Sequence, residues 1–214
     1  MTRFLLAILT LCVPATVAWS AITPSGPCKP DDEGFIRCWV ILDPIKLPER
    51  AAKHEENAQR EFFDKEFFPG QRLATPKDGD KVFIEGKECT WHARQSSDYT
   101  MSFEDLATDV ARSLFLGVVY ITCERDIPNV RLSIGSDDGS LWILNGQEVI
   151  RVYEARSIDR DQNSSPMLTL KKGLNILRLA VINGDGPSAA CTRFIDKNGA
   201  PVRSYTIHPT PPAR

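Results

Sequence analysis

The stretch GSDDGSLWILNGQEV, residues 135–149, combines two turn signals with an apolar strand and decides the fold. Asn145-Gly146 is the strongest hairpin signal in the chain, because a type I′ turn needs positive φ at both central residues. In the strand before this turn, Trp142 and Leu144 share one face and the residues between and before them share the other. The stretch therefore predicts a strand, a tight turn and a second, antiparallel strand.

Short β-rich segments and turn signals recur on both sides of this stretch. Residues 35–42 predict a first strand, and residues 113–124 form a long β-rich run. Glu-Gly at 85–86 and Lys-Lys-Gly at 171–173 each predict a hairpin. Many short strands separated by regularly spaced turns indicate a mainly β protein, an antiparallel β-sandwich or jelly roll.

One N-terminal surface helix is expected beside the strands. Pro48-Glu49 opens it, and Pro69-Gly70 stops it. The face of this helix opposite its apolar stripe is charged, as expected for a helix lying on the surface of a sandwich. The apolar stripe consists of Ala51, Ala52, Ala58, Phe62 and Phe63. A further helical turn or two is expected within residues 103–111.

The first residues have the layout of a secretory signal peptide. Arg3 precedes a short apolar run, and small residues follow, so that residues 1–20 predict a cleavable signal. The apolar run is too short to span a bilayer as a helix, so no transmembrane segment is predicted. We expect an exported protein, periplasmic, cell-surface or extracellular, with a linker at 21–34, a β-sandwich domain at 35–208 and a tail at 209–214.

Cysteine usage fits an oxidising compartment. Five cysteines follow the predicted signal, an odd number whose connectivity cannot be deduced from spacing. No Cys-x-x-Cys pair exists, which argues against a zinc ribbon or a thioredoxin-like redox site. We expect one or two structural bridges and a leftover buried thiol, with the pairing left open among Cys28, Cys38, Cys89, Cys123 and Cys191.

Charge and motif content exclude several classes of function. The formal net charge is −2 and no basic block occurs, which argues against nucleic acid as a partner. The three histidines lack metalloprotease spacing, and there is no Gly-x-Ser-x-Gly elbow, phosphate-cradling loop or Rossmann fingerprint. No catalytic residue is therefore predicted, and a small hydrolase is a distant alternative.

Three segments together resemble a known module. The three segments are FFPGQRLATPKDGDKVFIEGKECTWHA, LGVVYITCERDIPNVRLSIGSDDGSLWILNGQEVIR and DQNSSPMLTLKKGLNILRLAVINGDG. The match covers most of residues 60–200. They resemble a galactose-binding-like jelly-roll module of secreted bacterial proteins, often fused to glycoside hydrolases. The central segment is also similar to the protective-antigen-type sandwich, in which an S-D-D-G turn precedes an apolar strand that ends at an Asn-Gly or Asp-Gly turn.

The resemblance implies binding or architecture, not catalysis. Some lectins of the protective-antigen type use the paired aspartates to hold calcium, which in turn holds sugar hydroxyls. The chain departs from the first family after its NGDG segment. Where that family carries a Gly-Trp-Gly-aromatic run, this chain has Pro-Ser-Ala-Ala at 187–190, so that aromatic platform is absent.

The candidate ligand site follows from these residues. Asp137 and Asp138 offer hard oxygens to a calcium ion, with Asn183 or Asp185 arriving from a neighbouring loop. Turn formation alone also explains both aspartates, because Asp and Gly are preferred in bends. Trp91 is the remaining aromatic candidate for stacking on a sugar ring, with packing against the core as the alternative.

Another polar segment, residues 151–161, is rich in Arg and Asp. Such a segment can clamp hydroxyls or carboxylates by bidentate hydrogen bonds, or be a solvated loop. Together these patterns favour a secreted, non-catalytic sandwich that binds carbohydrate or serves as an accessory to an exported assembly. The alternative is a structural or protein-interaction domain without a glycan site, whose partner is a surface or periplasmic protein.

Overall fold

The computed structural model describes residues 22–52 and 55–212. These residues form two antiparallel sheets with little helix, 46% strand against 8% helix, which confirms the predicted mainly β sandwich. The predicted signal peptide lies outside the described residues. Within the described part of the chain, no helix combines the length and the apolar character needed to cross a membrane.

The larger sheet has nine strands. Its central pair is β6 with β12, which are antiparallel over eleven residue pairs, from Gly173 opposite Cys123 to Asn183 opposite Ser113. The path of the sheet runs β3 (Lys81–Ile84), β4 (Lys87–Gln95), β1 (Cys38–Leu42), β6 (Ser113–Cys123), β12 (Gly173–Asn183), β8 (Gly139–Leu144) and β9 (Gln147–Val152), and β2 (Ile45–Lys46) and β14 (Thr206–His208) also pair with β6.

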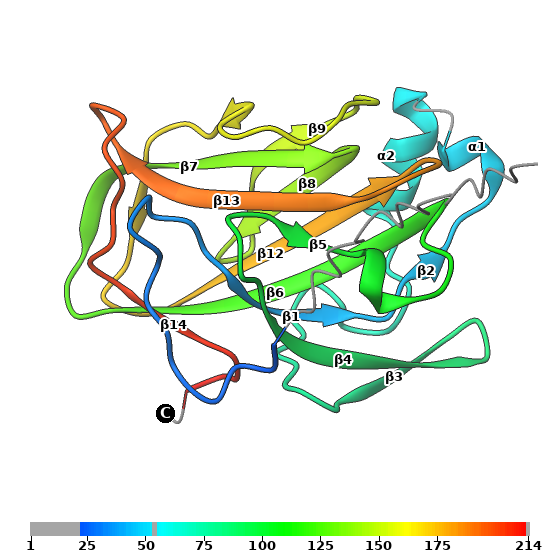
Figure 1. Cartoon of the computed structure of the whole chain (residues 1–214), viewed down its shortest axis with the longest axis horizontal. Helices are drawn as coiled ribbons and strands as arrows, with labels where there is room; N and C mark the ends of the chain where they lie inside the picture. Colours follow the sequence, from blue (N-terminus) through cyan, green and yellow to red (C-terminus); the bar gives the residue numbers. More distant parts are fainter. Residues whose placement is uncertain (1–21, 53–54, 213–214) are drawn as a thin grey trace, which may run out of the picture.

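The smaller sheet has five strands and lies against the larger one (Figure 1). Its path runs β10 (Asn163–Ser164), β7 (Ile127–Asp137), β13 (Ala189–Asp196) and β5 (Met101–Ser102), and β11 (Leu168–Leu170) also pairs with β7. Its long members are β7 and β13, paired over eight residues from Ala189 opposite Asp137 to Asp196 opposite Val130. The long strands of the two sheets thus form the two layers of the sandwich.

The central strands of the larger sheet are buried on both faces. On β8, Trp142 and Leu144 point into the core between the sheets, while Leu141 belongs to a second apolar cluster on the outer face. This confirms the alternation predicted from the sequence. The same alternation on β6 puts Phe115 between the sheets and Leu116 outside. Because neither face meets water, β6 has an almost continuous apolar sequence instead of an apolar–polar alternation.

Two of the three predicted hairpins are present. Asn145 and Gly146 have φ values of 52° and 82° and join β8 to β9, as the type I′ preference predicts. The Glu85-Gly86 turn joins β3 to β4. The prediction of a hairpin at residues 171–173 is wrong, because β11 pairs with β7 of the smaller sheet while β12 pairs within the larger one. Residues 171–173 therefore form a passage between the sheets, that is, a connection from a strand of one sheet to a strand of the other.

The single predicted helix is replaced by two short ones. These are α1, Glu49–Ala52, and α2, Glu56–Asp64, followed elsewhere by the one-turn 3-10 helix η1 at Glu104–Leu106. Of the predicted stripe, Ala51, Phe62 and Phe63 are buried in the outer apolar cluster. The second helix, α2, ends at Asp64, before Pro69, and the backbone is extended at Lys65, with ψ of 136°. The two helices cover the outer face of the larger sheet at one end (Figure 1).

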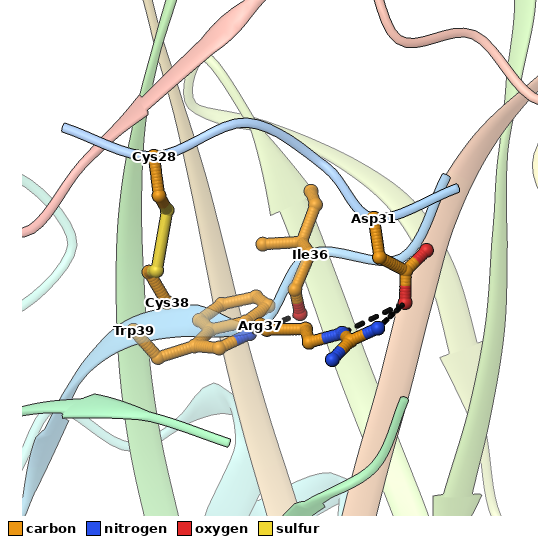
Figure 2. The surroundings of a disulfide bond; sticks show 6 residues. All are labelled: Cys28, Asp31, Ile36, Arg37, Cys38 and Trp39. Atoms are coloured by element: carbon orange, nitrogen blue, oxygen red, sulfur yellow. Dashed lines mark hydrogen bonds and ion pairs between the residues drawn. A yellow bond between two sulfur atoms is a disulfide. The ribbon is translucent and has the colours of Figure 1, made fainter. Parts of the chain in front are cut away.

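The segment expected to be a linker contacts the sandwich. Ile22 forms a bridge with Gln95 of β4, and a disulfide joins Cys28 to Cys38 at the start of β1. Figure 2 shows the turn that follows, in which Asp31 binds the guanidinium of Arg37 at 2.7–2.8 Å. Residues 22–34 are therefore covalently and electrostatically attached to the larger sheet.

The remaining thiols are structural in character. Cys89, Cys123 and Cys191 are free and buried, so the described residues contain one disulfide and three thiols. Burial raises the pKa of all three thiols, and that of Cys191 reaches about 12. A thiol that stays protonated is a poor nucleophile, so these residues serve as small apolar groups.

The β12 strand offers a matched test of this architecture. Leu177 is fully buried between the sheets, whereas Leu174 of the same strand is 43% exposed. We expect Leu177→Ala to lower the free energy of unfolding by about 2–5 kcal/mol, because it leaves a cavity in the core, and Leu174→Ala to lower it by less than about 1 kcal/mol. Urea denaturation measures both. Equal effects of the two substitutions would contradict the assignment of the inner face.

Candidate functional site

Two passages between the sheets meet at one end of the sandwich. The first runs from β7, which ends at Asp137, to β8, which begins at Gly139. The second runs from β12, which ends at Asn183, to β13, which begins at Ala189. Ala189 lies opposite Asp137 in one sheet, and Ile182 lies opposite Gly139 in the other. The register of both sheets therefore brings the two passages together.

Asp138 joins this end of the molecule internally. Its side chain is almost buried, with the residue 8% exposed. One carboxylate oxygen accepts the backbone N–H of Arg156 and the other accepts that of Gly184, both at 2.9 Å. The peptide bond that links it to Asp137 is cis. Asp138 thus connects three segments of the chain, which gives it a structural role whatever it binds.

Asp137 is in a different environment. Its carbonyl oxygen accepts a hydrogen bond from the Ser188 hydroxyl at 2.6 Å, which ties the two passages together. Its carboxyl group is half-buried, and burial together with the neighbouring charge of Asp138 raises its pKa to about 6, against the opposing effect of Arg156. A carboxylate in this position lacks full compensation of its charge, so a bound cation or a hydrogen-bond donor would stabilise it.

Arg156 supplies the nearest positive charge and is itself held firmly. Its guanidinium donates to the Ser136 carbonyl at 3.0 Å, to the Ser136 hydroxyl at 2.8 Å and to the Asn163 side chain at 2.6 Å. Burial lowers its pKa. The strand beside it requires Gly135, since a Cβ there would lie 1.8 Å from the Asp159 carbonyl oxygen. These hydrogen bonds hold Arg156 against Ser136 of β7, so this part of segment 151–161 is not a solvated loop.

Asn183 completes the group. It is fully buried, and its amide nitrogen donates to the carbonyls of Val110 and Gly186 at 2.9 and 3.1 Å. Among the described residues, its side-chain oxygen Oδ1 is buried and accepts no hydrogen bond. An unsatisfied buried acceptor is unfavourable and calls for a partner. A cation or a donor group of a ligand would satisfy it.

Two other predicted site residues lie elsewhere. The side chain of Asp185 is 85% exposed and faces Arg112 at 3.8 Å, so it does not join the group despite lying two residues from Asn183. Trp91 is 3% exposed and packs edge-on against Phe68, with ring centroids 6.5 Å apart. Its ring lies within the outer apolar cluster, where it leaves no open face for a sugar.

A pocket of about 220 Å³ opens beside Asp137. Most of its lining was not predicted, because it comes from the polar connection between β4 and η1 and from the passage after β12. The only signal was the density of Ser, Thr and Asp in residues 96–105. The lining residues are Ser96, Ser97, Asp98, Thr100, Met101, Ser102, Glu104, Asp105, Asp137, Ile158, Pro187, Ser188 and Ala189.

The side chains at this end suit a hard cation in kind. Within residues 22–52 and 55–212, no three His, Cys, Asp or Glu side chains come together as a metal site. Calcium also accepts amide, carbonyl and water oxygens, and Asp137, Asp138 and the unsatisfied Oδ1 of Asn183 are such oxygens. Of these three residues, Asp137 is the one that lines the pocket, so it would hold the ion, with the remaining ligands from carbonyls, water or a bound hydroxyl compound.

Comparisons with known proteins give few matches. No family model and no curated protein matches the chain. Among solved structures, it is similar to the PA14 domain of the antifreeze protein MpAFP, with 12% identity and a TM-score of 0.38 over 87% of this chain and 91% of that one.

Two glycosidases are also similar in part. A β-glucosidase from Kluyveromyces marxianus, solved with glucose, has 14% identity and a TM-score of 0.38 over 62% of this chain and 19% of that one. An α-xylosidase from Xanthomonas citri has 9% identity and a TM-score of 0.30 over 57% and 16%. This chain therefore spans less than a fifth of either enzyme.

The raised pKa of Asp137 predicts a particular dependence of stability on pH. Its pKa is about 6 when folded, above the value of about 3.9 expected when unfolded. The folded state therefore binds this proton more tightly, and the resulting stabilisation is complete below about pH 4 and is lost as the pH rises through about 6. Relative to Asp137→Asn, the wild type should lose stability between pH 4 and pH 7.

Urea denaturation at pH 4, 5.5 and 7 without calcium measures this difference. Asp185→Asn is the matched control, because Asp185 is exposed and the same substitution there should leave the wild-type profile unchanged. Parallel profiles for the wild type and Asp137→Asn would contradict the assigned environment of Asp137.

Proposed function

We propose that this chain is a secreted, non-catalytic module that binds carbohydrate in the pocket beside Asp137. The observation that carries the proposal is the pocket itself, which adjoins an incompletely compensated carboxylate and is lined largely by hydroxyl and carboxylate side chains. Sugars present many hydroxyls in fixed geometry, and such oxygens pair with them as donors and acceptors. The passages between the sheets would thus serve as the binding loops.

The size and the apolar part of the pocket narrow the ligand. Its volume of about 220 Å³ is below the roughly 300–1,000 Å³ of pockets for drug-sized ligands, which favours a single sugar unit or the end of a chain. Met101, Ile158 and Pro187 provide apolar surface for the C–H face of a pyranose ring. These side chains take the place of the aromatic platform that the sequence lacks.

Calcium fits this proposal as a partner of the site. When bound, the ion supplies positive charge and coordination positions for ligand hydroxyls. Asp137 would orient it from the first passage, and Asp138 would hold that passage against the second through the hydrogen bond that it accepts from the backbone N–H of Gly184. The charge of the ion would also relieve the repulsion that raises the pKa of Asp137.

Export is supported by the disulfide and by the predicted signal. The Cys28–Cys38 bridge belongs to proteins of oxidising compartments, and residues 1–20 predict a secretory signal. We therefore place the module in the periplasm, on the cell surface or outside the cell, where polysaccharides are available as ligands.

A protein-interaction function is the second candidate, and one surface feature favours it. Phe83 is 68% exposed on β3, which is an edge strand of the larger sheet. An exposed aromatic residue beside unpaired backbone groups suits the addition of a partner strand. This surface belongs to β3 and shares no residue with the pocket, so the two functions can be tested separately.

A glycan array probed with calcium and with a chelator tests the proposed function. We expect the wild type to bind one class of glycan on the array. Isothermal titration calorimetry should then give Asp137→Asn an affinity for that glycan at least tenfold lower than that of the wild type. If calcium takes part, the chelator should weaken binding to a similar degree. Asp185→Asn removes the same charge from an exposed position and should bind like the wild type.

Three outcomes would reject this function. Absence of any glycan signal under both conditions, with a folded protein, would favour the protein-interaction function. Hydrolysis of chromogenic glycosides that Asp137→Asn or Glu104→Gln abolishes would show that the carboxylates of the pocket are catalytic. Equal affinity of the wild type and Asp137→Asn for a captured glycan would place the binding site elsewhere.

A further inference from the structure

Arg178 occupies an unusual place for a charged residue. It lies in the middle of β12, with Val118 of β6 and Ile143 of β8 as its neighbours across the sheet. Strand alternation directs its side chain away from the core between the sheets and toward the outer apolar cluster, because Leu177 and Leu179 on either side of it face the core. The guanidinium is thus surrounded mainly by hydrocarbon.

The charge of Arg178 has no acidic partner among the described residues. Its one hydrogen bond there runs from a terminal nitrogen to the carbonyl oxygen of Ala74, at 2.9 Å. Its Nε is buried and donates to no described acceptor, and burial lowers its pKa. Arg151 of β9, which β8 separates from β12, differs, because its guanidinium pairs with Asp64 at 2.9 Å and Glu148 at 2.6 Å.

Arg178 is one of the residues that line a small cavity. Its volume is about 50 Å³, and most of its walls are apolar. Arg72 is the other charged residue of the lining, but it already pairs with Glu66 and donates to the Asp64 carbonyl. Among residues 22–52 and 55–212, no acidic side chain lines the cavity. The lining residues are Phe63, Gln71, Arg72, Trp91, Leu116, Gly117, Val118, Leu141, Ile143, Arg178, Leu179 and Ala180.

An unpaired, partly buried cation beside a cavity is unfavourable for stability. A buried charge needs a counter-charge and filled hydrogen bonds, and an apolar residue at this position would pack better. Residues that lower stability in this way often serve binding, because the missing partner arrives with the ligand. The uncompensated donors of Arg178 point to an anionic partner.

We propose that this cavity binds a short-chain monocarboxylate of acetate to propionate size. The carboxylate accepts hydrogen bonds from the terminal guanidinium nitrogens of Arg178, since Nε is buried, and the short hydrocarbon part lies against Leu141 and Ile143. This site is independent of the pocket beside Asp137, with which it shares no lining residue.

Size, charge and polarity select this ligand together. A volume of 50 Å³ holds roughly three to five water-sized atoms, and acetate and propionate have four and five non-hydrogen atoms. One guanidinium balances one negative charge and forms a bidentate pair with a carboxylate. Inorganic phosphate has a similar size, but it carries more charge and would place oxygens against the apolar walls. A neutral amide would leave the charge of Arg178 uncompensated.

Calorimetric melting of the wild-type protein with propionate tests the proposal. A ligand that binds only the folded state raises the melting temperature with its concentration. We expect a dose-dependent rise with propionate, little change with isosteric propionamide, and little change with phosphate at equal ionic strength. This comparison needs no variant. A rise that propionamide or phosphate reproduces would overturn the proposal, as would no rise with propionate at tens of millimolar.

Variants of Arg178 provide the second test. Arg178→Met should melt at the same or a higher temperature than the wild type, and its affinity for propionate should fall at least tenfold. Arg178→Lys keeps the charge without the planar fork and should bind several-fold more weakly than the wild type. Arg131→Met, at an exposed position of β7, is the control and should respond like the wild type. An unchanged response of Arg178→Met would also overturn the proposal.

Discussion

The pairing of β6 with β12 is the constraint on which the rest of the molecule depends. Eleven consecutive residue pairs fix the register between these strands, and both faces of the pair are covered by apolar side chains. A slip of one residue would exchange the two faces, so burial on both sides and the length of the pairing jointly determine the register. That register puts Asn183 at the end of β12, beside Asp138, and Arg178 in its middle, under the outer layer.

Asp138 and Asp137 show how adjacent residues of the same type acquire different roles. Asp138 is satisfied by two backbone N–H groups and holds the passages between the sheets together. Asp137 has a raised pKa because its carboxyl group is partly buried near that same charge. Burial is the larger cause of the raised pKa of Asp137, and the charge of Asp138 adds to it. This arrangement is typical of sites in which structure and binding share a loop.

The sequence predicted those parts of the fold that depend on local chemistry. Trp142 and Leu144 had the spacing of a strand face, and Asn145-Gly146 had the backbone freedom of a type I′ turn. The turn at 171–173 has the same local signal, yet its strands pair in different sheets, because pairing depends on partners distant in the chain. Likewise, no sequence signal indicated the break between α1 and α2, so a single helix was predicted.

The candidate site was predictable only in part, for a related reason. Asp137, Asp138 and Asn183 lie at the ends of long strands, so the strand pattern was sufficient to bring them together. Asp185 lies beyond the strand end, where alternation no longer fixes direction, and its side chain faces solvent. Trp91 was ambiguous because the sequence does not reveal a second apolar cluster over the outer face. The pocket lining comes largely from the short elements β5 and η1 and from the irregular connections beside them, for which sequence periodicity carries little information.

The double burial of the larger sheet also explains where binding functions can reside. A sheet with one solvated face can present a ligand platform on that face, but the central strands of this sheet are covered by apolar side chains on both faces, with helix residues and the segment after α2 on the outer side. Apart from the exposed edge strand β3, two kinds of place remain. One is the end of the sandwich, where the passages between sheets expose oxygen atoms around Asp137. The other is the small cavity in the outer layer that Arg178 lines, where the charge of Arg178 has no acidic partner among the described residues. The first offers oxygens and the second a cation, so the two would select ligands of opposite electrostatic character.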